Sequence, residues 1–405
     1  MPPGFPNIRH IRVFLEALRA GSVSVAADRC HLSQPAATQA ISRLEADLGT
    51  ALLVRRSRAF APTASGRLFA ARVAAALDHL NSGARAARRA GGDGRRGRAS
   101  FDNALTAAQL RTIIAIANTG SFTVAARTLG LSQPSVHRAA RGLEDIAGVA
   151  FFTATSSGVE LTAAAQAFVL SAKLAQDEIR QGIEEISREL GQDRGTFIIG
   201  SLPLARTSIV PKATNAMITA NPGVQVRVVD GRYGELLRSL REGDIDCLIG
   251  ALRDPPPADD ITQELLFDDP LAIVAHPRHP LAGRRNLSVD DTLDYPWVAP
   301  PRETPAGQYL YDTLRIQDRD RTPVRVVSSS LIMLRGILGE GDYVSIISRH
   351  QISVEERDGH IEPLDIALSD SSRPIGLTYR SNWRPTETQA QFIDFLRQFG
   401  APRKA

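Results

Sequence analysis

The sequence predicts a mixed fold in which two small, predominantly helical domains stand in tandem before a larger, two-lobed α/β domain. The first observation behind this prediction is an internal repeat, because residues 10–77 reappear at 109–176 without a gap. The second is the tetrapeptide LSQP at 32–35 and 131–134, which separates two short helical patterns in each copy. The third is a change near residue 196 from helical periodicity to alternating strands and helices.

Composition indicates a globular protein with room for three or more compact units in 405 residues. No apolar run approaches the roughly 18 residues of a membrane span. Residues 1–4 lack the basic and apolar regions of a secretory signal, so we expect the protein in the cytoplasm, away from membranes. Cys30 and Cys247 lie in unrelated segments, which favours isolated thiols over a disulfide or a metal site.

Charge separates the two copies of the repeat. Residues 9–89 hold 13 arginines and 5 acidic residues, whereas residues 108–188 hold 7 basic and 7 acidic residues. From residue 195 onward the chain has 24 basic and 28 acidic residues. Only the first copy therefore has the positive charge expected of a module that binds a polyanion such as DNA.

The first copy has the pattern of a helix-turn-helix. Ser33 is a good N-cap, and Pro35 falls in the first helical turn, where a missing N–H costs nothing. A predicted buried stripe then recurs at helical spacing at Ala37, Ile41, Leu44 and Leu48. The outward positions are Ala36, Thr38, Gln39, Ser42 and Arg43. Short polar groups, an amide and a guanidinium are the groups with which a recognition helix reads bases or phosphates.

An apolar strand that runs into arginines follows this helix. Residues 52–58 end in Arg55, Arg56 and Arg58, which suits a winged hairpin whose tip reaches the DNA backbone or minor groove. We therefore predict a winged helix-turn-helix domain over residues 8–62.

The second copy, predicted over 105–161, keeps the scaffold and changes the exposed face. Its buried stripe is Val136, Ala140, Leu143 and Ala147. The positions of the three wing arginines hold Ala154, Thr155 and Ser157. The candidate DNA contacts that this copy retains are Ser132, His137, Arg138 and Arg141. We expect a non-DNA or auxiliary role for it; the alternative is a full second reader that extends the operator.

Two long helical runs and one linker connect these domains. We predict a helix over 63–90, a flexible basic linker over 91–104 and a helix over 162–191. A helix near 29 residues is too long for a small domain, so 162–191 should pack on a partner helix, with Glu184, Glu185 and Glu189 toward solvent. The run 63–90 either does the same or covers its own domain.

Strand and helix patterns alternate through residues 195–400. We assign residues 195–262 and 373–400 to lobe 1 and residues 267–366 to lobe 2, with crossing strands between them and a ligand cleft. Ligands in such folds bind beyond the carboxyl ends of strands. The effector-contacting candidates are therefore Ser201, Leu202, Arg232, Tyr233, Arg302, Ser328 and Ser329. The alternatives are loop capping for Ser201 and Ser329 and plain solvation for Arg232 and Arg302.

The segments 21–45 and 120–144, GSVSVAADRCHLSQPAATQAISRLE and GSFTVAARTLGLSQPSVHRAARGLE, resemble the LysR-type transcriptional regulators, and residues 195–400 are similar to that family's effector domain. The resemblance implies a cytosolic transcription factor with a periplasmic-binding-protein-like effector domain. It implies operator DNA, a small-molecule effector such as a carboxylate or a sugar, self-association as a dimer or tetramer, and RNA polymerase as partners. The recognition positions that carry over are Ser33, Gln34, Pro35, Thr38, Gln39, Ser42 and Arg43, with the wing at Arg55 and Arg56. Ser201 corresponds to a frequent inducer contact.

One departure from the family is large, because such chains normally carry a single winged helix. A dimer of this chain would carry four, so the usual half-site spacing does not transfer. The rival class is a catalytic or solute-binding α/β protein. The chain has no G-x-S-x-G elbow, phosphate loop, H-E-x-x-H or paired-cysteine motif, so we expect no catalysis, cofactor or metal.

Overall fold

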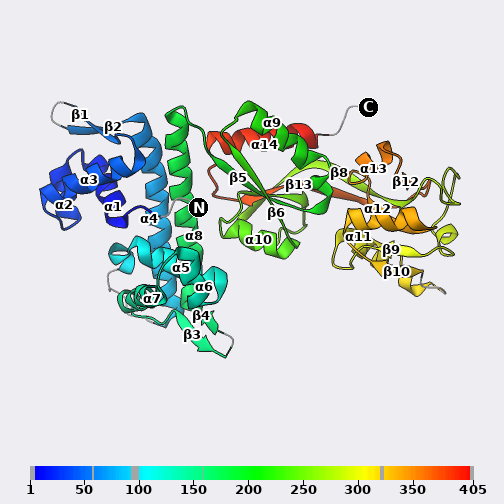
Figure 1. The fold of residues 1–405 in the computed structure, drawn as a ribbon, viewed down its shortest axis with the longest axis horizontal. Coiled ribbons are helices and arrows are strands. Elements are labelled where there is room, and N and C mark those ends of the chain that lie inside the picture. Colours follow the sequence, from blue (N-terminus) through cyan, green and yellow to red (C-terminus); the bar gives the residue numbers. More distant parts are fainter. Residues whose placement is uncertain (1–4, 57–58, 93–99, 157, 320–322, 402–405) are drawn as a thin grey trace. The chain divides into compact units, whose positions relative to one another are not determined.

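The computed structural model describes residues 5–56, 59–92, 100–156, 158–319 and 323–401 (Figure 1). The chain divides into two compact units. Unit 1 comprises Met1–Gly195 with Glu242–Asp244, and unit 2 comprises Thr196–Arg241 with Ile245–Ala405. Within the described ranges, no helix is both long and apolar enough to cross a membrane.

The first repeat of unit 1 consists of three helices, a hairpin and a long helix. Its elements are α1 (Ile8–Ala20), α2 (Val23–Arg29), α3 (Gln34–Leu48), β1 (Leu53–Arg56), β2 (Ala59–Pro62) and α4 (Ala64–Ala90). Side-chain caps set the helix starts, since the Ser33 hydroxyl accepts from Ala36 N and the Thr63 hydroxyl from Gly66 N. Gly49 ends α3 at φ 68°, a left-handed conformation that favours glycine.

The second repeat has the same elements in the same order. They are α5 (Ala107–Thr119), α6 (Phe122–Leu129), α7 (Gln133–Ala147), β3 (Phe152–Thr155), β4 (Gly158–Leu161) and α8 (Ala163–Glu189). Ser132 and Thr162 cap α7 and α8 as their counterparts do in the first repeat, and Gly148 ends α7 at φ 72°. The caps and turns that the sequence predicts therefore place both repeats in one local fold.

Helices α4 and α8 lie side by side along most of their length (Figure 1). Their buried residues join α1 and α3 of the first repeat and α5 and α7 of the second in one hydrophobic core. The partner that we expected for α8 is therefore α4 of the same chain, which answers the question left open for residues 63–90. The expectation that Glu184 and Glu185 face solvent is wrong, because Glu185 binds the buried guanidinium of Arg72 and Glu184 binds the buried guanidinium of Arg180. Glu189 is exposed, as expected.

Part of the predicted linker 91–104 forms a short helix that packs on the rest of unit 1. Residues 93–99 lie outside the described residues, but Phe101–Ala104 form a short 3-10 helix. The ring of Phe101 is buried against Phe151 and Phe168. Asp102 is also buried and binds Arg12 of α1 at 3.2 Å. The sequence around Phe101 is polar and therefore predicts a linker. Phe101 and Asp102 are buried because residues from distant segments of the chain, Phe151, Phe168 and Arg12, cover them.

Unit 2 is built on one mixed sheet with the strand order β10-β9-β11-β8-β13-β7-β5-β6, with β12 paired to β8. Its strands are β5 (Thr196–Ser201), β6 (Gln225–Asp230), β7 (Cys247–Ala251), β8 (Ile261–Ala275), β9 (Trp297–Ala299), β10 (Val324–Val327), β11 (Val344–Ser348), β12 (Glu362–Pro363) and β13 (Ser372–Arg380). Its helices are α9 (Ile209–Ala220), α10 (Tyr233–Arg241), α11 (Pro305–Gln308), α12 (Leu331–Glu340), α13 (Ser353–Arg357) and α14 (Glu387–Gly400). Short 3-10 turns lie at Pro203–Arg206, Asp290–Thr292 and Ile316–Asp318, and a π-helical turn at Tyr309–Thr313.

The long strand β8 runs through both lobes of unit 2, because its residues 261–270 pair with β13 and its residues 271–275 pair with β11. Strand β13 is antiparallel to β8 and also pairs with β7 in lobe 1. One core lies between the β5–β7 strands, α9 and α14, and a second lies among β9, β11 and residues 306–316. The sequence predicts that lobe 2 begins at residue 267, whereas the strand that enters it, β8, already begins at Ile261. Asp268, Asp269 and Pro270 interrupt the apolar pattern there, although the backbone continues as one paired strand.

Candidate functional site

Helix α3 presents a polar face on a buried support. Ala37, Ala40 and Ile41 pack in the core of the first repeat, and Leu44 is buried behind them. The side chains that the sequence assigns to DNA are exposed, namely Ser33, Gln34, Pro35, Thr38, Gln39, Ser42 and Arg43. The Thr38 hydroxyl donates to the Gln34 carbonyl at 3.0 Å, so this hydroxyl is engaged by its own helix. Of these candidates, the other exposed polar side chains of α3 are the amides of Gln34 and Gln39, the hydroxyl of Ser42 and the guanidinium of Arg43.

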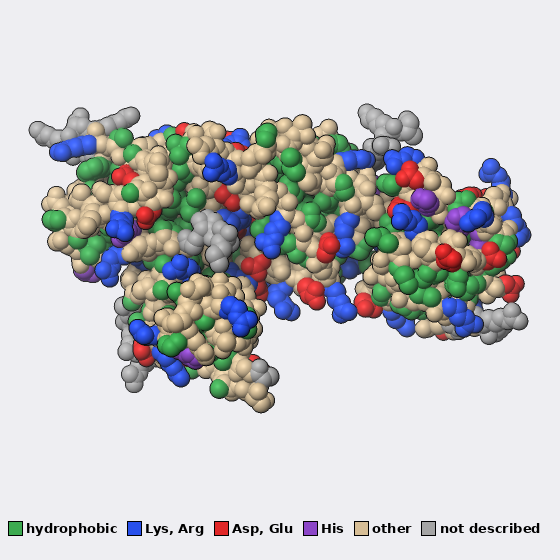
Figure 2. Space-filling view, viewed as in Figure 1, with side chains coloured by type: hydrophobic (Ala, Val, Ile, Leu, Met, Phe, Trp, Pro, Cys, Tyr) green, Lys and Arg blue, Asp and Glu red, His purple; other side chains and the backbone are tan. Residues whose placement is uncertain are grey.

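The first hairpin is held against α3 by one carboxylate. Glu45 Oε1 accepts from Leu52 N at 2.7 Å and from Leu53 N at 3.0 Å. Arg55 on β1 is exposed, and the strand continues to Arg56 in register with Ala59. Arg58, the third arginine expected at the wing, lies outside the described residues. Figure 2 shows arginine (blue) at this hairpin, at the upper left of the view, since the hairpin holds no lysine.

The second repeat reproduces this frame at positions 99 residues later. Glu144 Oε1 accepts from Phe151 N at 2.8 Å and from Phe152 N at 3.2 Å. The Thr63 hydroxyl donates to the Ala51 carbonyl at 2.8 Å, and the Thr162 hydroxyl donates to the Ala150 carbonyl at 2.8 Å. The hairpin β3–β4 is therefore fixed to α7 in the same manner as β1–β2 is fixed to α3.

The exposed face of the second repeat differs in chemistry. His137 is stacked on Phe122 with ring centroids 4.1 Å apart, which turns it toward α6. Arg138 is exposed, and Arg141 is 81% exposed with a 3.3 Å contact to Glu144. The Ser132 hydroxyl lies 2.8 Å from the Ser135 hydroxyl at the start of α7. Figure 2 shows no Lys or Arg on the visible face of the hairpin β3–β4 at the bottom of the view.

In lobe 1, the predicted effector residues lie at the carboxyl ends of β5 and β6. Ser201 is fully buried and its hydroxyl donates to the Leu202 carbonyl, so local bonding occupies it. The side chain of Leu202 covers Gly250, where a β-carbon would approach it to 2.3 Å. Arg232 is exposed. Tyr233 is half-buried beneath the guanidinium of Arg253 at 4.7 Å, and burial raises the pKa of this phenol, opposed by the Arg253 charge.

In lobe 2, the predicted residues follow β9 and β10. Arg302 is exposed and binds Asp312 at 2.7 Å, so it is paired at the surface. Ser328 N donates to the Ala299 carbonyl, and the Ser328 hydroxyl accepts from Ser330 N at 3.2 Å. Ser329 is exposed. Among the described residues, no hydrogen bond or ion pair joins this group to the lobe 1 group.

A polar cluster that the sequence analysis missed lies where β8 and β13 connect the lobes. Asp269, which is 1% exposed, accepts from Arg373 Nη2 at 2.7 Å and from His350 N at 3.0 Å. Arg373 Nε and His350 Nε2 are buried, and neither has a hydrogen-bond partner among the described residues. The ring of His350 lies 4.9 Å from that of Phe267.

The pKa values of this cluster follow from its burial. Burial lowers the pKa of His350 below its ordinary value, while Asp269 opposes the shift and Lys212 adds to it. Burial also lowers the pKa of Arg373, against the attraction of Asp269. The one local signal for this cluster was the pair of aspartates, Asp268 and Asp269, inside an apolar strand pattern. The sequence could not show the partners of Asp269, because His350 and Arg373 lie 81 and 104 residues away.

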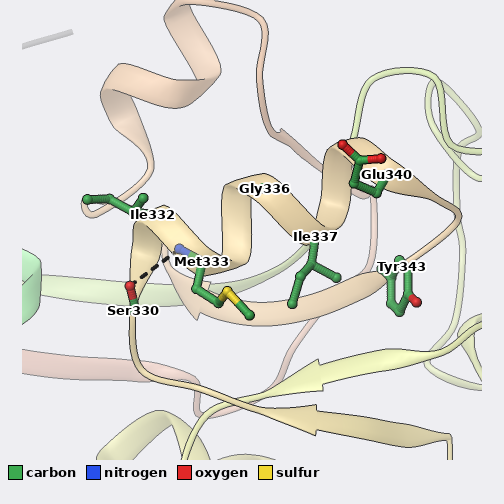
Figure 3. A pocket seen from close by; sticks show the side chains of 7 residues that line it. All are labelled: Ser330, Ile332, Met333, Gly336, Ile337, Glu340 and Tyr343. Atoms are coloured by element: carbon green, nitrogen blue, oxygen red, sulfur yellow. Dashed lines mark hydrogen bonds between the residues drawn. The ribbon is translucent and has the colours of Figure 1, made fainter.

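A shallow, largely apolar hollow of about 420 Å³ lies along α12 (Figure 3). Ile332, Met333, Ile337 and Tyr343 line it, and the Ser330 hydroxyl caps the helix by accepting from Met333 N at 3.3 Å. Ile332 is 77% exposed and Met333 52% exposed, so the helix presents apolar side chains to the surface. This hollow is separate from the predicted effector residues, except that it begins next to Ser329.

Comparisons with known proteins match both units. A family model described as "LysR substrate binding domain" matches residues 190–401. A second model, "Bacterial regulatory helix-turn-helix protein, lysR family", matches twice, at residues 8–67 and 107–166. The chain is 30% identical to the HTH-type transcriptional regulator GalR of Pseudomonas putida over 396 residues, which covers 97% of each chain. It is 29% identical to the regulator PcaQ of Agrobacterium fabrum over 71% of this chain and 93% of that protein.

Solved structures show the same fold. A variant of full-length OxyR from Pseudomonas aeruginosa has a TM-score of 0.53 at 23% identity and covers 72% of this chain and 93% of its own. CbnR, a LysR family transcriptional regulator, has a TM-score of 0.50 at 20% identity and covers 73% and 99%. A DNA-binding helix-turn-helix matched in both repeats and a substrate-binding domain matched over more than half of the chain identify this protein as a member of the LysR family of bacterial transcriptional regulators.

Proposed function

We propose that this regulator binds double-stranded operator DNA chiefly through the first repeat, and that a small molecule bound in unit 2 changes this binding. Residues 8–62 and 105–161 are then two tandem winged helix-turn-helix domains, and 195–400 is a two-lobed effector domain of the periplasmic-binding-protein type. Because its relatives GalR and PcaQ are transcriptional regulators, we propose that it acts in the cytoplasm and without catalysis.

The observation that supports this function best is the combination of α3 and its hairpin. Gln39, Ser42 and Arg43 are exposed on a helix whose opposite side is buried, and the hairpin with Arg55 is anchored to it by Glu45. Amide and guanidinium groups on a recognition helix contact base edges, and arginines on a wing contact phosphates. The positive charge of the first repeat provides the attraction that dominates the affinity of such modules.

A binding titration tests this assignment. The full chain first selects an operator from random DNA, and fluorescence anisotropy then measures affinity across a series of salt concentrations. Arg43→Ala and Arg55→Ala should each weaken binding, and loss of a phosphate contact should reduce the salt slope by about one unit. Arg111→Ala is the matched control, because Arg111 is exposed on α5. If both variants bind like the unaltered chain, α3 is not the principal reader.

For the effector we propose a small carboxylate that binds at the crossing of β8 and β13. Arg373 Nε and His350 Nε2 are buried polar atoms without partners among the described residues, which costs about 1 to 3 kcal/mol for each such group. Carboxylate oxygens accept hydrogen bonds from arginine in a favoured geometry. Tyr233 with Arg253 in lobe 1, and Ser328 and Ser329 in lobe 2, are the proposed further contacts.

A ligand panel distinguishes the two expected effector classes. Calorimetric titration of the full chain with small carboxylates and with neutral sugars should give binding with carboxylates only. His350→Gln should weaken that binding while it preserves the fold, since the ring is half-buried beside Phe267. Sugar binding that is unchanged in this variant would contradict the carboxylate assignment.

The response to the ligand follows from its place between the lobes. A molecule that binds one closure state of the two lobes more tightly than the other shifts the protein toward that state. We propose that this shift changes the spacing of the DNA-reading helices across an oligomer, with RNA polymerase as a further partner. Differential affinity of this kind couples effector and operator binding reciprocally.

Self-association is proposed through the two free edges of the sheet in unit 2. Strands β6 and β10 are the outermost strands, and each carries an exposed valine, Val228 or Val327. The helices beside them, α9 and α12, expose Ile218, Ile332 and Met333. Exposed apolar groups on edge strands are typical of surfaces that pair with another chain, so a dimer or tetramer of this protein should use them.

A further inference from the structure

The pairing of α4 with α8 runs antiparallel. Arg72, near the start of α4, binds Glu185 and Gln181 near the end of α8. Gly83, near the end of α4, lies against Ser171 near the start of α8, where a β-carbon on Gly83 would fall 2.4 Å from that of Ser171. The contacts therefore progress in opposite directions along the two helices.

This pairing obeys the same 99-residue correspondence as the sequence repeat. A β-carbon on Gly83 would meet Ser171 and Phe168, and one on Gly182 would meet Arg72 and Phe69. Each member of the second set is the repeat counterpart of a member of the first. Two copies of one element that make the same contacts on each other are related by a twofold axis, which here passes near the middle of both helices.

The twofold relationship extends from the long helices to the reading helices. Thr63 joins α4 to the first hairpin as Thr162 joins α8 to the second, and Glu45 and Glu144 join the hairpins to α3 and α7. One continuous core links α4 and α8 to all of these elements. Twofold-related recognition helices are the arrangement with which dimeric helix-turn-helix proteins read two half-sites on one duplex.

The polar contacts of the pair favour α4 with α8 over either helix with a copy of itself. Arg72 is 6% exposed and is neutralised by Glu185 and Glu178, both on α8. At the equivalent positions α4 itself carries His79, Ser82 and Ala86. An α4–α4 pair would therefore bury Arg72 without a carboxylate, and an α8–α8 pair would leave the glutamates without a cation, which is costly for buried charges.

We propose that unit 1 of a single chain is a complete reader of two unlike DNA half-sites. The first repeat reads one half-site through Gln39, Ser42, Arg43 and Arg55, all exposed. The second repeat reads the other through Arg138 and Arg141, both exposed on α7. The second repeat has equal numbers of basic and acidic residues over 108–188, so its affinity for its half-site is lower. This inference rests on the proposed function of the first repeat, and it differs from the non-DNA role that charge alone suggests for the second.

The first arm of the test asks whether the helices pair within one chain. Gly83→Cys with Ser171→Cys, and separately Arg72→Cys with Gly182→Cys, place cysteines at the two symmetric contacts. The first pair needs the helices to part by about 1 Å to reach disulfide geometry. Both oxidised full-length variants should run as monomers with an intramolecular bond on denaturing gels. Disulfide-linked dimers, or no bond in either variant while thermal unfolding is preserved, would overturn the proposal.

The second arm asks which base pairs each repeat reads. The full chain is used to select sites from random DNA, and the selection is repeated with Arg43→Ala and with the double change Arg138→Ala, Arg141→Ala. Each change should erase sequence preference at a different half-site, and the double change should weaken binding to the composite site by about tenfold. Insertion of five base pairs between the half-sites, about half a helical turn, should have the same effect as the double change.

The outcomes separate this inference from the function on which it rests. If the α7 double variant selects and binds the same site as the Arg111→Ala control, the second repeat is no reader, and the role of α3 is untouched. If Arg43→Ala alone has no effect, the proposed function of the first repeat fails instead.

Discussion

Arg72 on α4 and Glu185 on α8 form a two-pronged ion pair, with Nε 3.2 Å and Nη2 2.6 Å from Glu185 Oε1. Burial alone would lower the pKa of Arg72, but the hydrogen bonds and charges of Glu185 and Glu178 hold it above its ordinary value. Gln181 Oε1 completes the site at 2.7 Å from Nη1. This pair ties the two halves of unit 1 together.

Removal of this cation should be strongly destabilising. Arg72→Ala leaves the Glu185 and Glu178 carboxylates half-buried and unpaired, and loss of one partner of a buried pair typically costs about 3 kcal/mol of unfolding free energy. Chemical denaturation of the full chain measures the loss. Arg85→Ala is the control, because Arg85 is exposed on the same helix and should change the unfolding free energy by less than about 0.5 kcal/mol. Equal stability of the two variants would show that the pair contributes nothing.

The close contact at Gly83 should give a non-additive pair of mutations. Gly83→Ala places a β-carbon against Ser171, and such overpacking typically costs about 1 to 3 kcal/mol, more than the roughly 1 kcal/mol that alanine adds to helix stability. Ser171→Gly in the same chain removes the opposing β-carbon and should recover most of the loss. Gly336→Ala on α12, with open space around it, should be stabilising instead. Additive effects of the two changes at the contact would argue against close helix packing.

The carboxylates that anchor the hairpins should matter unequally for DNA binding. Glu45→Ala and Glu144→Ala each leave two partly buried N–H groups unpaired. Each change should therefore lower the unfolding free energy by about 1 to 3 kcal/mol, and the melting temperature with it. Glu45→Ala should weaken operator binding more, because only the first hairpin carries arginines. Glu45→Gln keeps an acceptor oxygen and should retain most of the binding. A larger DNA effect from Glu144→Ala would reverse the proposed order of the two readers.

Carboxylate binding in unit 2 should depend on pH through His350. Burial keeps the pKa of the free histidine below its ordinary value of 6.5, with Asp269 opposing the shift and Lys212 adding to it. An anion beside the ring favours its protonated form, so binding takes up a proton and should strengthen as pH falls toward the lowered pKa of His350 in the free protein. Titration across this range should lose that component in His350→Gln. The same pH dependence in both proteins would remove His350 from the site.

Charge on the apolar edge of lobe 2 should reduce self-association. Ile332→Asp introduces a carboxylate at a side chain that is 77% exposed on α12. Light scattering should then show a lower oligomeric mass, because the edge no longer offers an apolar surface to a second copy. Leu265→Asp is the control, since Leu265 is 56% exposed on the internal strand β8. If both variants retain the mass of the unaltered chain, the association surface lies elsewhere.

Local signals in the sequence were sufficient for most elements. The serine and threonine caps, the glycines that end α3 and α7, and the apolar stripes of Ala37 and Val136 each act over a few residues. The same holds for the strands of unit 2, whose cores follow runs of apolar residues. The effector site was harder to predict from the sequence, because Ser201 has a suitable position at the end of β5 but its hydroxyl donates to the Leu202 carbonyl.

The sequence by itself determines the duplication, the charge difference between the repeats and the exposed face of α3. Each of these depends on the identity and spacing of residues within one helix or hairpin. The pairing of α4 with α8 and the meeting of Asp269, His350 and Arg373 depend on which distant surfaces fit together. A 27-residue amphipathic helix buries its apolar stripe equally well against many partners. The choice of partner came from Arg72, whose buried charge is neutralised by glutamates more than 100 residues away.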